Sequence, residues 1–492
     1  MICVVVVLVS ALGASSGWSG TELTTAIPTT KSGQMARDWL KLCAVPAIGT
    51  MTKWAAENFS EAALKREPAE DQAREFVEFC KINGDLRVTE VTEPKPATVT
   101  LQLFGAESGM WYKMELTTND SGKLNQEGNL PSNLAAILPI NPPESSLPKE
   151  LSDAALAREV SSTVARLSKA GLFSGIVSVA RGTSVVASAS AGYANREKKT
   201  PISGATQFTI GSMGKLFTAV AVGQLVDQKK VSFDDKVGKF FPEYPNRTVR
   251  DEVTVGMLLA HTAGMGDFLP QRTPEMNKNG VKRAAEFMPL YDQDEPKFKP
   301  GTSWAYSNAG LALAGAIVEK ASGENYPEYL RRHIFAVAGM THSDPNNVPL
   351  TSDKLATPYT QMTAQGSSSD WHAADQDIGS PAGGAISTAD DLVRFAEALR
   401  SGTLISKSTF AEITKPHDNG RGRTGYAIGI NTLYGRTLVG HTGGFPGVNT
   451  SLRILLDSPY TLVVLANQDP PAEMYPDSIV TALMTEKAKL EK

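Results

Sequence analysis

The chain has 492 residues, a length that predicts two or three domains rather than one. With 41% hydrophobic and 20% charged residues, its composition is that of a globular protein with a core of normal size. The net charge of −4 offers no basic surface, so the charge balance argues against nucleic acid as a partner.

Residues 1–19 predict a secretory signal peptide. Residues 2–12 form a short apolar run followed by small residues, and this run is too short to span a bilayer. No Lys or Arg precedes it, so a buried strand is the alternative. A signal would make the protein secreted or periplasmic. We expect no stable membrane span after signal removal, because no second apolar run reaches spanning length.

Three cysteines occur, and Cys3 lies within the expected signal peptide. Cys43 and Cys80 would remain in the mature protein. An oxidising compartment would allow them to pair, whereas two buried free thiols are the alternative, because spacing alone does not show proximity. Neither belongs to a CxxC pair, so a redox or metal site is not expected there.

Residues 30–130 predict a small α+β domain. Apolar residues at helical spacing come first, and strand-like pieces follow at 98–104, 110–116 and 123–130, separated by turn compositions. This order of elements resembles that of the cone-shaped, nuclear-transport-factor-like modules found beside hydrolase domains. Five prolines then crowd residues 131–150, which predicts a linker without helix or central strand.

Residues 151–492 predict an α/β domain in which an antiparallel sheet is flanked by terminal helices and carries a helical insertion. A helix is expected over 152–171, capped by Ser152 and ended by Gly171. Strand patterns lie at 173–181, 183–194, 425–430, 436–440, 449–456 and 461–467. Helical patterns lie between them at 212–227, 254–260, 309–322 and 388–401, and a last one at 472–490. A cleft between the sheet and the inserted helices is the natural place for a site.

Ser212 and Lys215 are the candidate nucleophile and its base. On a helix, residues three apart share a face, so the amine can sit beside the hydroxyl. A partly desolvated lysine loses its proton near neutral pH. The alternative is a purely structural role, in which Ser212 caps the helix and the alkyl chain of Lys215 packs on apolar surface while its amine reaches water. A second SxxK, Ser146 to Lys149, lies in the proline-rich stretch, where no pocket is expected.

A Tyr-x-Asn pattern supplies a second candidate base. It occurs three times, and Tyr306-Ser-Asn308 alone leads directly into an apolar helix. The pairs at 193–195 and 244–246 lie in a turn after a strand and in a proline turn. Tyr306 therefore lies at a helix mouth, as Ser212 does.

Together, SMGK at 212–215, YSN at 306–308 and HTGG at 441–444 form an ordered triple. With GYANREKKTPI, TVGMLLAHTAG and SPAGGAISTADDLVRFAEALRSG, they resemble the class C β-lactamase-like serine hydrolases. That superfamily includes penicillin-binding proteins, D-aminopeptidases and esterases. The resemblance covers about residues 155–485 and implies a β-lactamase/transpeptidase-like fold. It also implies a small-molecule ester, amide or peptide substrate.

The resemblance implies these roles. Ser212 attacks the carbonyl and forms the acyl-enzyme, while Lys215 and Tyr306 share the proton transfers. Asn308 orients the substrate or Lys215. The backbone N–H groups of Ser212 and Gly444 form the oxyanion hole. No HExxH or HxH pattern occurs among the six histidines, so neither a metal nor another cofactor is expected.

The strand at 436–444 would lie along the substrate, with His441, Thr442 and Gly443 as binding residues. His441 stands where many relatives carry the lysine of K-T-G. A histidine, with a pKa of about 6.5, is mostly neutral at pH 7, so we expect a hydrogen-bond donor with little charge. His261, in the similar HTAG stretch, is expected to be a buried structural histidine.

The sequence thus favours a serine hydrolase acting on esters or small, D-configured or other peptide-type amides. β-Lactamase or DD-peptidase-like activity is the alternative, because a neutral histidine weakens carboxylate recognition. A non-catalytic penicillin-recognising sensor, with the N-terminal domain as a binding module, is the alternative from another class.

Overall fold

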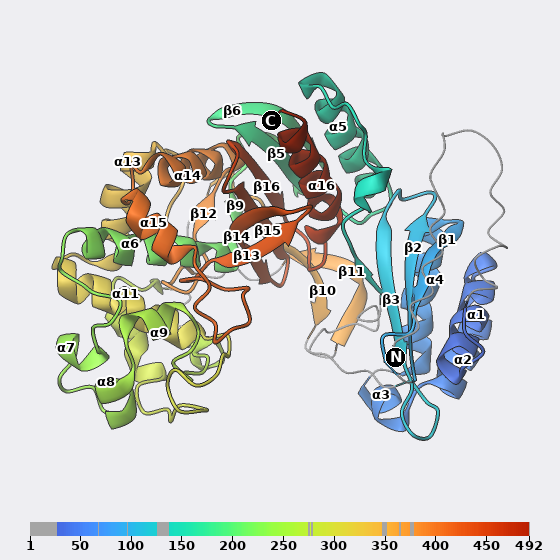
Figure 1. Cartoon of the computed structure of the whole chain (residues 1–492), viewed down its shortest axis with the longest axis horizontal. Helices are drawn as coiled ribbons and strands as arrows, with labels where there is room; N and C mark the ends of the chain where they lie inside the picture. Colours follow the sequence, from blue (N-terminus) through green and yellow to red (C-terminus); the bar gives the residue numbers. More distant parts are fainter. Residues whose placement is uncertain are drawn as a thin grey trace. The chain divides into compact units, whose positions relative to one another are not determined.

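The computed structural model describes residues 27–491 apart from 67, 96, 125–136, 274–275, 277–278, 347–351, 364–365 and 374–377. The expected signal peptide over residues 1–19 lies outside this range, as does most of the strand expected over 123–130. The chain divides into two compact units, Met1–Pro148 and Lys149–Lys492 (Figure 1). No helix in the described ranges is long and apolar enough to cross a membrane.

The first unit has the α+β order that the sequence predicts. Its helices are α1 (Lys31–Ala44), α2 (Ile48–Asn58), α3 (Glu61–Arg66) and α4 (Ala69–Asn83). An antiparallel sheet follows in the order β1 (Leu86–Thr92), β2 (Thr98–Gly105), β3 (Trp111–Thr117) and β4 (Ile137–Pro139). Its core is aromatic: the ring of Phe76 lies 5.9 Å from that of Trp39 and 6.0 Å from that of Trp54.

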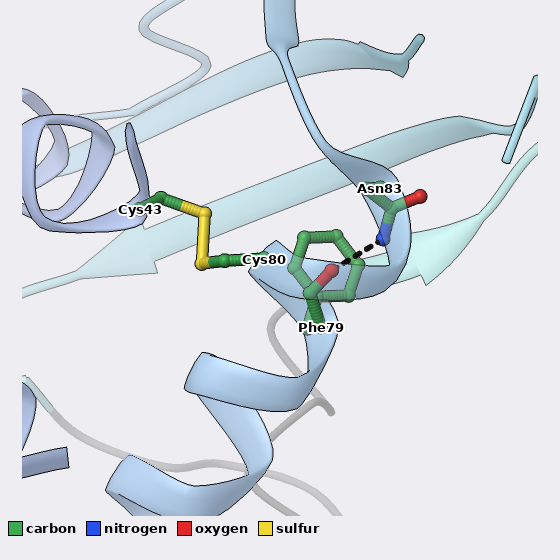
Figure 2. The surroundings of a disulfide bond; sticks show 4 residues. All are labelled: Cys43, Phe79, Cys80 and Asn83. Carbon is green, nitrogen blue, oxygen red and sulfur yellow. Dashed lines mark hydrogen bonds between the residues drawn. A yellow bond between two sulfur atoms is a disulfide. The ribbon is translucent and has the colours of Figure 1, made fainter. Parts of the chain in front are cut away.

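A disulfide joins two helices of this unit. Cys43, near the end of α1, is bonded to Cys80 on α4, with their Cα atoms 5.2 Å apart (Figure 2). Both side chains are buried. One turn further along α4, the Asn83 amide donates to the carbonyl of Phe79 at 2.8 Å and helps to end the helix. Of the two alternatives for the cysteines, the structure therefore has the pair.

The stretch expected to be a linker, 131–150, is only partly one. Ile137–Pro139 forms β4, which pairs with β3 through Tyr112, Lys113 and Met114. Five prolines do not prevent this, because β4 is an edge strand and Pro139 is its last residue, where no ladder hydrogen bond from its nitrogen is needed. The division between the two units falls after Pro148.

The second unit is built on six antiparallel strands in the order β13-β14-β15-β16-β5-β6. They are β5 (Gly175–Arg181), β6 (Ser184–Ala191), β13 (Gly429–Leu433), β14 (Arg436–Phe445), β15 (Val448–Leu455) and β16 (Tyr460–Ala466). Strands from both ends of the unit meet at the centre, where Val177 of β5 pairs with Val464 of β16. This is the antiparallel sheet that the sequence predicts.

Helices cover the two faces of this sheet (Figure 1). The terminal helices α5 (Asp153–Lys169) and α16 (Met474–Leu490) pack against each other. On the sheet, α5 packs against β6 and α16 packs against β16. The inserted helices include α6 (Lys215–Asp227), α11 (Asn308–Ser322) and α14 (Ala389–Ser401). Helix α6 is buried along nearly its whole length, as its apolar sequence predicts, and packs on α11.

Shorter elements complete the insertion. The helices are α7 (Val237–Phe240), α8 (Arg247–Glu252), α9 (Val255–Leu259), α12 (Tyr326–Tyr329), α13 (Ala336–Ala338) and α15 (Lys407–Ile413), with a π-helical segment at Leu330–Phe335. Within the insertion, 3₁₀ segments lie at Gly211–Gly214, Leu269–Gln271 and Ala284–Leu290, and a further 3₁₀ turn, Glu144–Ser146, belongs to the first unit. Small paired strands are β7 (Tyr193–Asn195), β8 (Thr200–Pro201), β9 (Phe208–Thr209), β10 (Tyr359–Thr363), β11 (Gly366–Ala373) and β12 (Ile386–Ser387).

Two elements begin several residues later than the sequence predicts. The strand expected over 425–430 begins only at Gly429, because Ala427 has a φ of 53° and Gly425 donates to the carbonyl of Ile428, which makes a tight turn. The helix expected over 212–227 begins at Lys215, and Ser212 lies in the 3₁₀ turn before it.

We expect the disulfide to stabilise the first unit. Replacing Cys43 and Cys80 by serine removes a cross-link between residues 37 apart, which should lower the free energy of unfolding by about 3–4 kcal/mol. Denaturant unfolding with and without a reductant would measure this. Residues 149–492 contain no cysteine, so reductant should not affect reactions at Ser212, and the double variant should not respond to it at all. Two reactive thiols in the unreduced native protein would contradict the disulfide.

Candidate active site

The turn that carries Ser212 packs directly on β14 and β15 of the six-stranded sheet. Gly211 has a φ of 51°, and a Cβ built there would lie 3.2 Å from the Gly444 nitrogen. A Cβ at Gly443 would lie 2.0 Å from the carbonyl oxygen of Ile210, so only glycine allows β14 to approach this closely. The hydroxyl of Thr450 also donates to the Ile210 carbonyl, at 3.0 Å. The Gly211–Gly214 turn, which carries Ser212, is therefore in direct contact with β14.

The Lys215 amine is fully buried at the start of α6 and surrounded by acceptors. As an ammonium it donates to Ser212 Oγ at 3.0 Å, to Asn308 Oδ1 at 2.8 Å and to the carbonyl oxygen of Ala382. As a neutral amine it keeps two N–H groups for the amide and carbonyl oxygens. Its lone pair then faces the Ser212 hydroxyl, which is the arrangement a general base requires.

Burial lowers the pKa of Lys215 to about 7, against the opposing effect of the negative charge of Asp267. Near neutral pH a large fraction of the lysine is therefore an uncharged amine. An ordinary lysine, with a pKa of about 10.4, would be almost entirely protonated and could not accept a proton.

Tyr306 approaches Ser212 from the other side. Its hydroxyl donates to Ser212 Oγ at 2.9 Å, and its ring lies 4.8 Å from the Lys215 amine. Although 42% of the Tyr306 surface is exposed, desolvation of its hydroxyl raises the pKa of Tyr306 to about 12, so at neutral pH the hydroxyl is protonated and acts as a donor. The geometry therefore separates the two roles that the sequence left shared: Lys215 suits the base and Tyr306 suits the proton donor.

Asn308 opens α11 and uses both ends of its amide. Its Oδ1 accepts from Lys215, and its Nδ2 donates to Asp267 Oδ2 at 3.0 Å. Ser307 caps the same helix by accepting from the Gly310 N–H at 2.8 Å. Two roles were expected for Asn308, orienting the substrate or orienting Lys215, and these contacts fit the second.

His261 is buried and supports Tyr306. Its ring stacks on that of Tyr306 with the centroids 4.6 Å apart, and its Nδ1 accepts from the backbone N–H of Ser307 at 3.1 Å. Burial lowers the pKa of His261 to about 3, so it stays neutral with its proton on Nε2. It is the structural histidine that the sequence predicts.

His441 differs from the expected donor. Its Nδ1 lies 2.6 Å from the carbonyl oxygen of Thr442, which can only accept, so the proton resides on Nδ1. Desolvation, with a smaller effect from the charge of Lys215, lowers the pKa of His441 to about 4. A neutral ring with its proton on Nδ1 leaves Nε2 as an acceptor. The expectation of a free donor at this position was therefore wrong, whereas the expectation of little charge agrees with the lowered pKa.

The other expected binding residues follow His441 on β14. Within the described residues, the ladder between β13 and β14 ends at Gly440, while pairing with β15 continues to Phe445. Thr442 and Gly444 are exposed, and Gly443 is buried against Ile210. Alternation along the strand places the Thr442 side chain on the face opposite to His441. The Gly444 nitrogen borders the turn of Ser212, so both expected oxyanion donors lie at one place.

The remaining sequence candidates lie elsewhere. Tyr244 is buried and Asn246 caps α8, while Asn195 donates to Thr357 Oγ1 at 3.3 Å. Two groups beside Lys215 and Asn308 were not predicted from the sequence: the backbone carbonyl of Ala382 and the carboxylate of Asp267. Ala382 lies in the SPAGGAIS segment, but a backbone carbonyl has no side-chain signature in a sequence. In the described part of the chain, no group of three His, Cys, Asp or Glu residues is placed to hold a metal ion.

Comparison with known proteins identifies the family of the second unit. The beta-lactamase family profile matches residues 160–483, about two thirds of the sequence. The chain belongs to the beta-lactamase family. Penicillin-binding protein 4* of Bacillus subtilis is 28% identical to it over 328 residues, which cover 63% of this chain and 71% of that protein.

Two solved structures of the beta-lactamase fold resemble this chain. A penicillin-binding protein from Bacillus halodurans is 28% identical, with a TM-score of 0.55, covering 66% of this chain and 97% of its own. A D-amino acid amidase from Ochrobactrum anthropi has a TM-score of 0.57 at 21% identity and covers 68% and 97%, respectively. The second similarity concerns the fold alone.

We expect reactions at Ser212 to follow the ionisation of Lys215. The rate should rise with pH through about 7, because the neutral amine is the reactive form and the protonated amine dominates below that pH. A pH–rate profile of Ser212 labelling by a fluorophosphonate would measure this. Lys215→Arg, which cannot deprotonate, should lower the rate by about 10²-fold or more at every pH. A profile that is flat through pH 7 would contradict this role.

Proposed function

We propose that this member of the beta-lactamase family is a serine hydrolase that forms an acyl-enzyme on Ser212. It hydrolyses esters or small peptide-type amides, in the manner of an esterase or a D-aminopeptidase. The observation that carries the proposal is the pair of hydrogen bonds at Ser212 Oγ, from the Lys215 amine at 3.0 Å and the Tyr306 hydroxyl at 2.9 Å. A serine held between a base and a proton donor is an activated nucleophile.

The first half-reaction uses these groups in sequence. Neutral Lys215 accepts the Ser212 proton as Oγ attacks the substrate carbonyl carbon. The backbone N–H groups of Ser212 and Gly444 stabilise the negative charge on the carbonyl oxygen. Tyr306 protonates the departing oxygen or nitrogen and regains a proton from the Lys215 ammonium. The net result is an acyl-Ser212 ester and a neutral alcohol or amine.

Water completes the reaction by attacking the acyl-Ser212 ester. Lys215 is neutral again after the first step, so it accepts a proton from the attacking water and passes it to Ser212 Oγ as the bond to the acyl group breaks, which restores the Ser212 hydroxyl and the neutral amine. Atoms and protons balance: one water is consumed and one acid is released.

The complete hydrogen-bonding set around Ser212 disfavours the non-catalytic sensor alternative, since a degenerate site usually lacks one member.

The substrate class is inferred from the charge of the cleft. His441, where many relatives carry a lysine, is neutral and presents an acceptor, so it does not supply a cation for a substrate carboxylate. Esters and amides without a carboxylate at that position fit this environment better than β-lactams. β-Lactamase or DD-peptidase-like activity remains the second candidate, because the matched relatives include penicillin-binding proteins.

We also propose that the protein is secreted or periplasmic. The Cys43–Cys80 disulfide supports this, because disulfides persist in oxidising compartments and are rare in the cytosol. The apolar run at residues 2–12 supports it independently.

A substrate comparison tests the proposed activity. We expect p-nitrophenyl acetate, or the p-nitroanilide of D-alanine, to be hydrolysed with a higher kcat/KM than a cephalosporin. Ser212→Ala should abolish all of these reactions, and it serves as the control for background hydrolysis. A cephalosporin rate far above the ester and amide rates would reverse the proposed substrate ranking, and full activity of Ser212→Ala would disprove the acyl-enzyme mechanism.

The charge at position 441 can be tested separately. His441→Lys should raise kcat/KM for an ester bearing a carboxylate by about tenfold relative to a matched neutral ester, because a charged hydrogen bond becomes available. His441→Gln is the matched uncharged control and should not change this ratio. If the lysine variant gains no preference for the carboxylate, the charge of this residue does not set specificity.

A further inference from the structure

A carboxylate outside the sequence motifs stands behind the Lys215 amine. Asp267 lies in the loop that follows the HTAG stretch, and its Oδ2 accepts from Asn308 Nδ2 at 3.0 Å. Its Oδ1 accepts from the backbone N–H of Leu269 at 3.0 Å. Because each oxygen has a partner, the carboxylate is held in one orientation.

The loop itself is tied to the start of α11. The carbonyl of Gly266 accepts from the Ser307 hydroxyl at 2.9 Å and from the Ala309 N–H at 3.3 Å. Asp267 itself is exposed, but the hydrogen bonds of Gly266 hold the neighbouring backbone against the start of α11, so the contact with Asn308 rests on a fixed backbone.

An asparagine amide can be turned end for end, and only its partners decide between the two orientations. Here the oxygen of Asn308 must face Lys215, where it accepts an N–H at 2.8 Å. A carboxylate only accepts hydrogen bonds, so Asp267 requires the NH₂ group at the opposite end. The reversed amide would set oxygen against oxygen at Asp267 and N–H against N–H at Lys215.

We propose that Asp267 is a positioning residue for the reaction at Ser212: it fixes the Asn308 amide so that Oδ1 holds one N–H of Lys215 and leaves the lone pair of the amine directed at Ser212 Oγ. The inference rests on the proposed serine hydrolase function. Hydrogen bonds connect Ser212 to Lys215 and Lys215 to Asn308, and Asp267 adds a fourth residue to this chain. A catalytic base is commonly oriented by such a further group.

Asp267 also has an electrostatic effect that a purely structural residue would lack. The ionisable groups around Lys215 are Asp267, Tyr306, His261 and His441. With pKa values of about 12, 3 and 4, the tyrosine and the two histidines are uncharged near pH 7. Among these neighbours, Asp267 alone brings charge, and it favours the protonated form of Lys215.

The test follows the rate of Ser212 labelling by a fluorophosphonate across pH, in folded full-length protein. Asp267→Ala should slow labelling roughly ten- to hundredfold, as expected for loss of a hydrogen bond to a charged group. In this variant the acid limb of the pH–rate profile should move to lower pH by about half a unit or more, because the anion that stabilises the Lys215 ammonium is gone. Asp267→Asn should show the same shift with a smaller loss of rate, since its oxygen can still accept from Asn308.

Three further variants separate positioning from general damage. Asp267→Glu should recover part of the rate and the acid limb of the wild type. Asp353→Asn removes a carboxylate whose side chain is 98% exposed, and it should change neither quantity. In an Asn308→Ala background, Asp267→Ala should cost little additional rate, because the amide through which it acts is absent.

An unmoved acid limb in Asp267→Asn, or an equal cost of Asp267→Ala with and without Asn308, would overturn the positioning role. These outcomes differ from failure of the proposed function, which would appear as wild-type protein that is folded but not labelled at Ser212.

Discussion

Burial of the Lys215 amine is the constraint on which the rest of the site depends. Helix α6 is apolar on all sides, so its first residue enters the core, where an ammonium is costly unless acceptors surround it. Asn308 and the Ala382 carbonyl supply those acceptors without adding charge. The ammonium is therefore tolerated but not strongly favoured, and its pKa falls to about 7. The same burial that makes α6 a central helix gives its lysine the lowered pKa that a base near neutral pH requires.

Two histidines in near-identical stretches show how backbone partners determine the state of a ring. His261 Nδ1 receives an N–H from Ser307, so its proton lies on Nε2. His441 Nδ1 faces the carbonyl of Thr442, so its proton lies on Nδ1. Both rings are neutral near pH 7, yet they present opposite hydrogen-bonding ends to their surroundings. Residue type and local motif alone do not distinguish them.

Much of the fold and the main site motifs could be predicted from the sequence, and the exceptions have physical causes. The pairing of Ser212 with Lys215 follows from spacing, and the burial of α6 follows from its apolar pattern. The contributions of Ala382 and Asp267 could not be predicted, because one acts through a backbone carbonyl and the other through a contact between distant segments. The strand β4 was missed because prolines tolerated at a sheet edge resemble those of a linker. The protonated nitrogen of His441 depends on one local distance that no pattern encodes.

The order of strands in the second unit bears on when the site can exist. β5, near the start of the unit, pairs with β16, which lies far from it in the sequence, and β14 lies two strands beyond β16. The turn of Ser212 rests on β14, so Ser212 and Gly444 come together only when segments far apart in the sequence have packed against each other. Reactivity of Ser212 towards a covalent label would therefore report that this long-range sheet has formed.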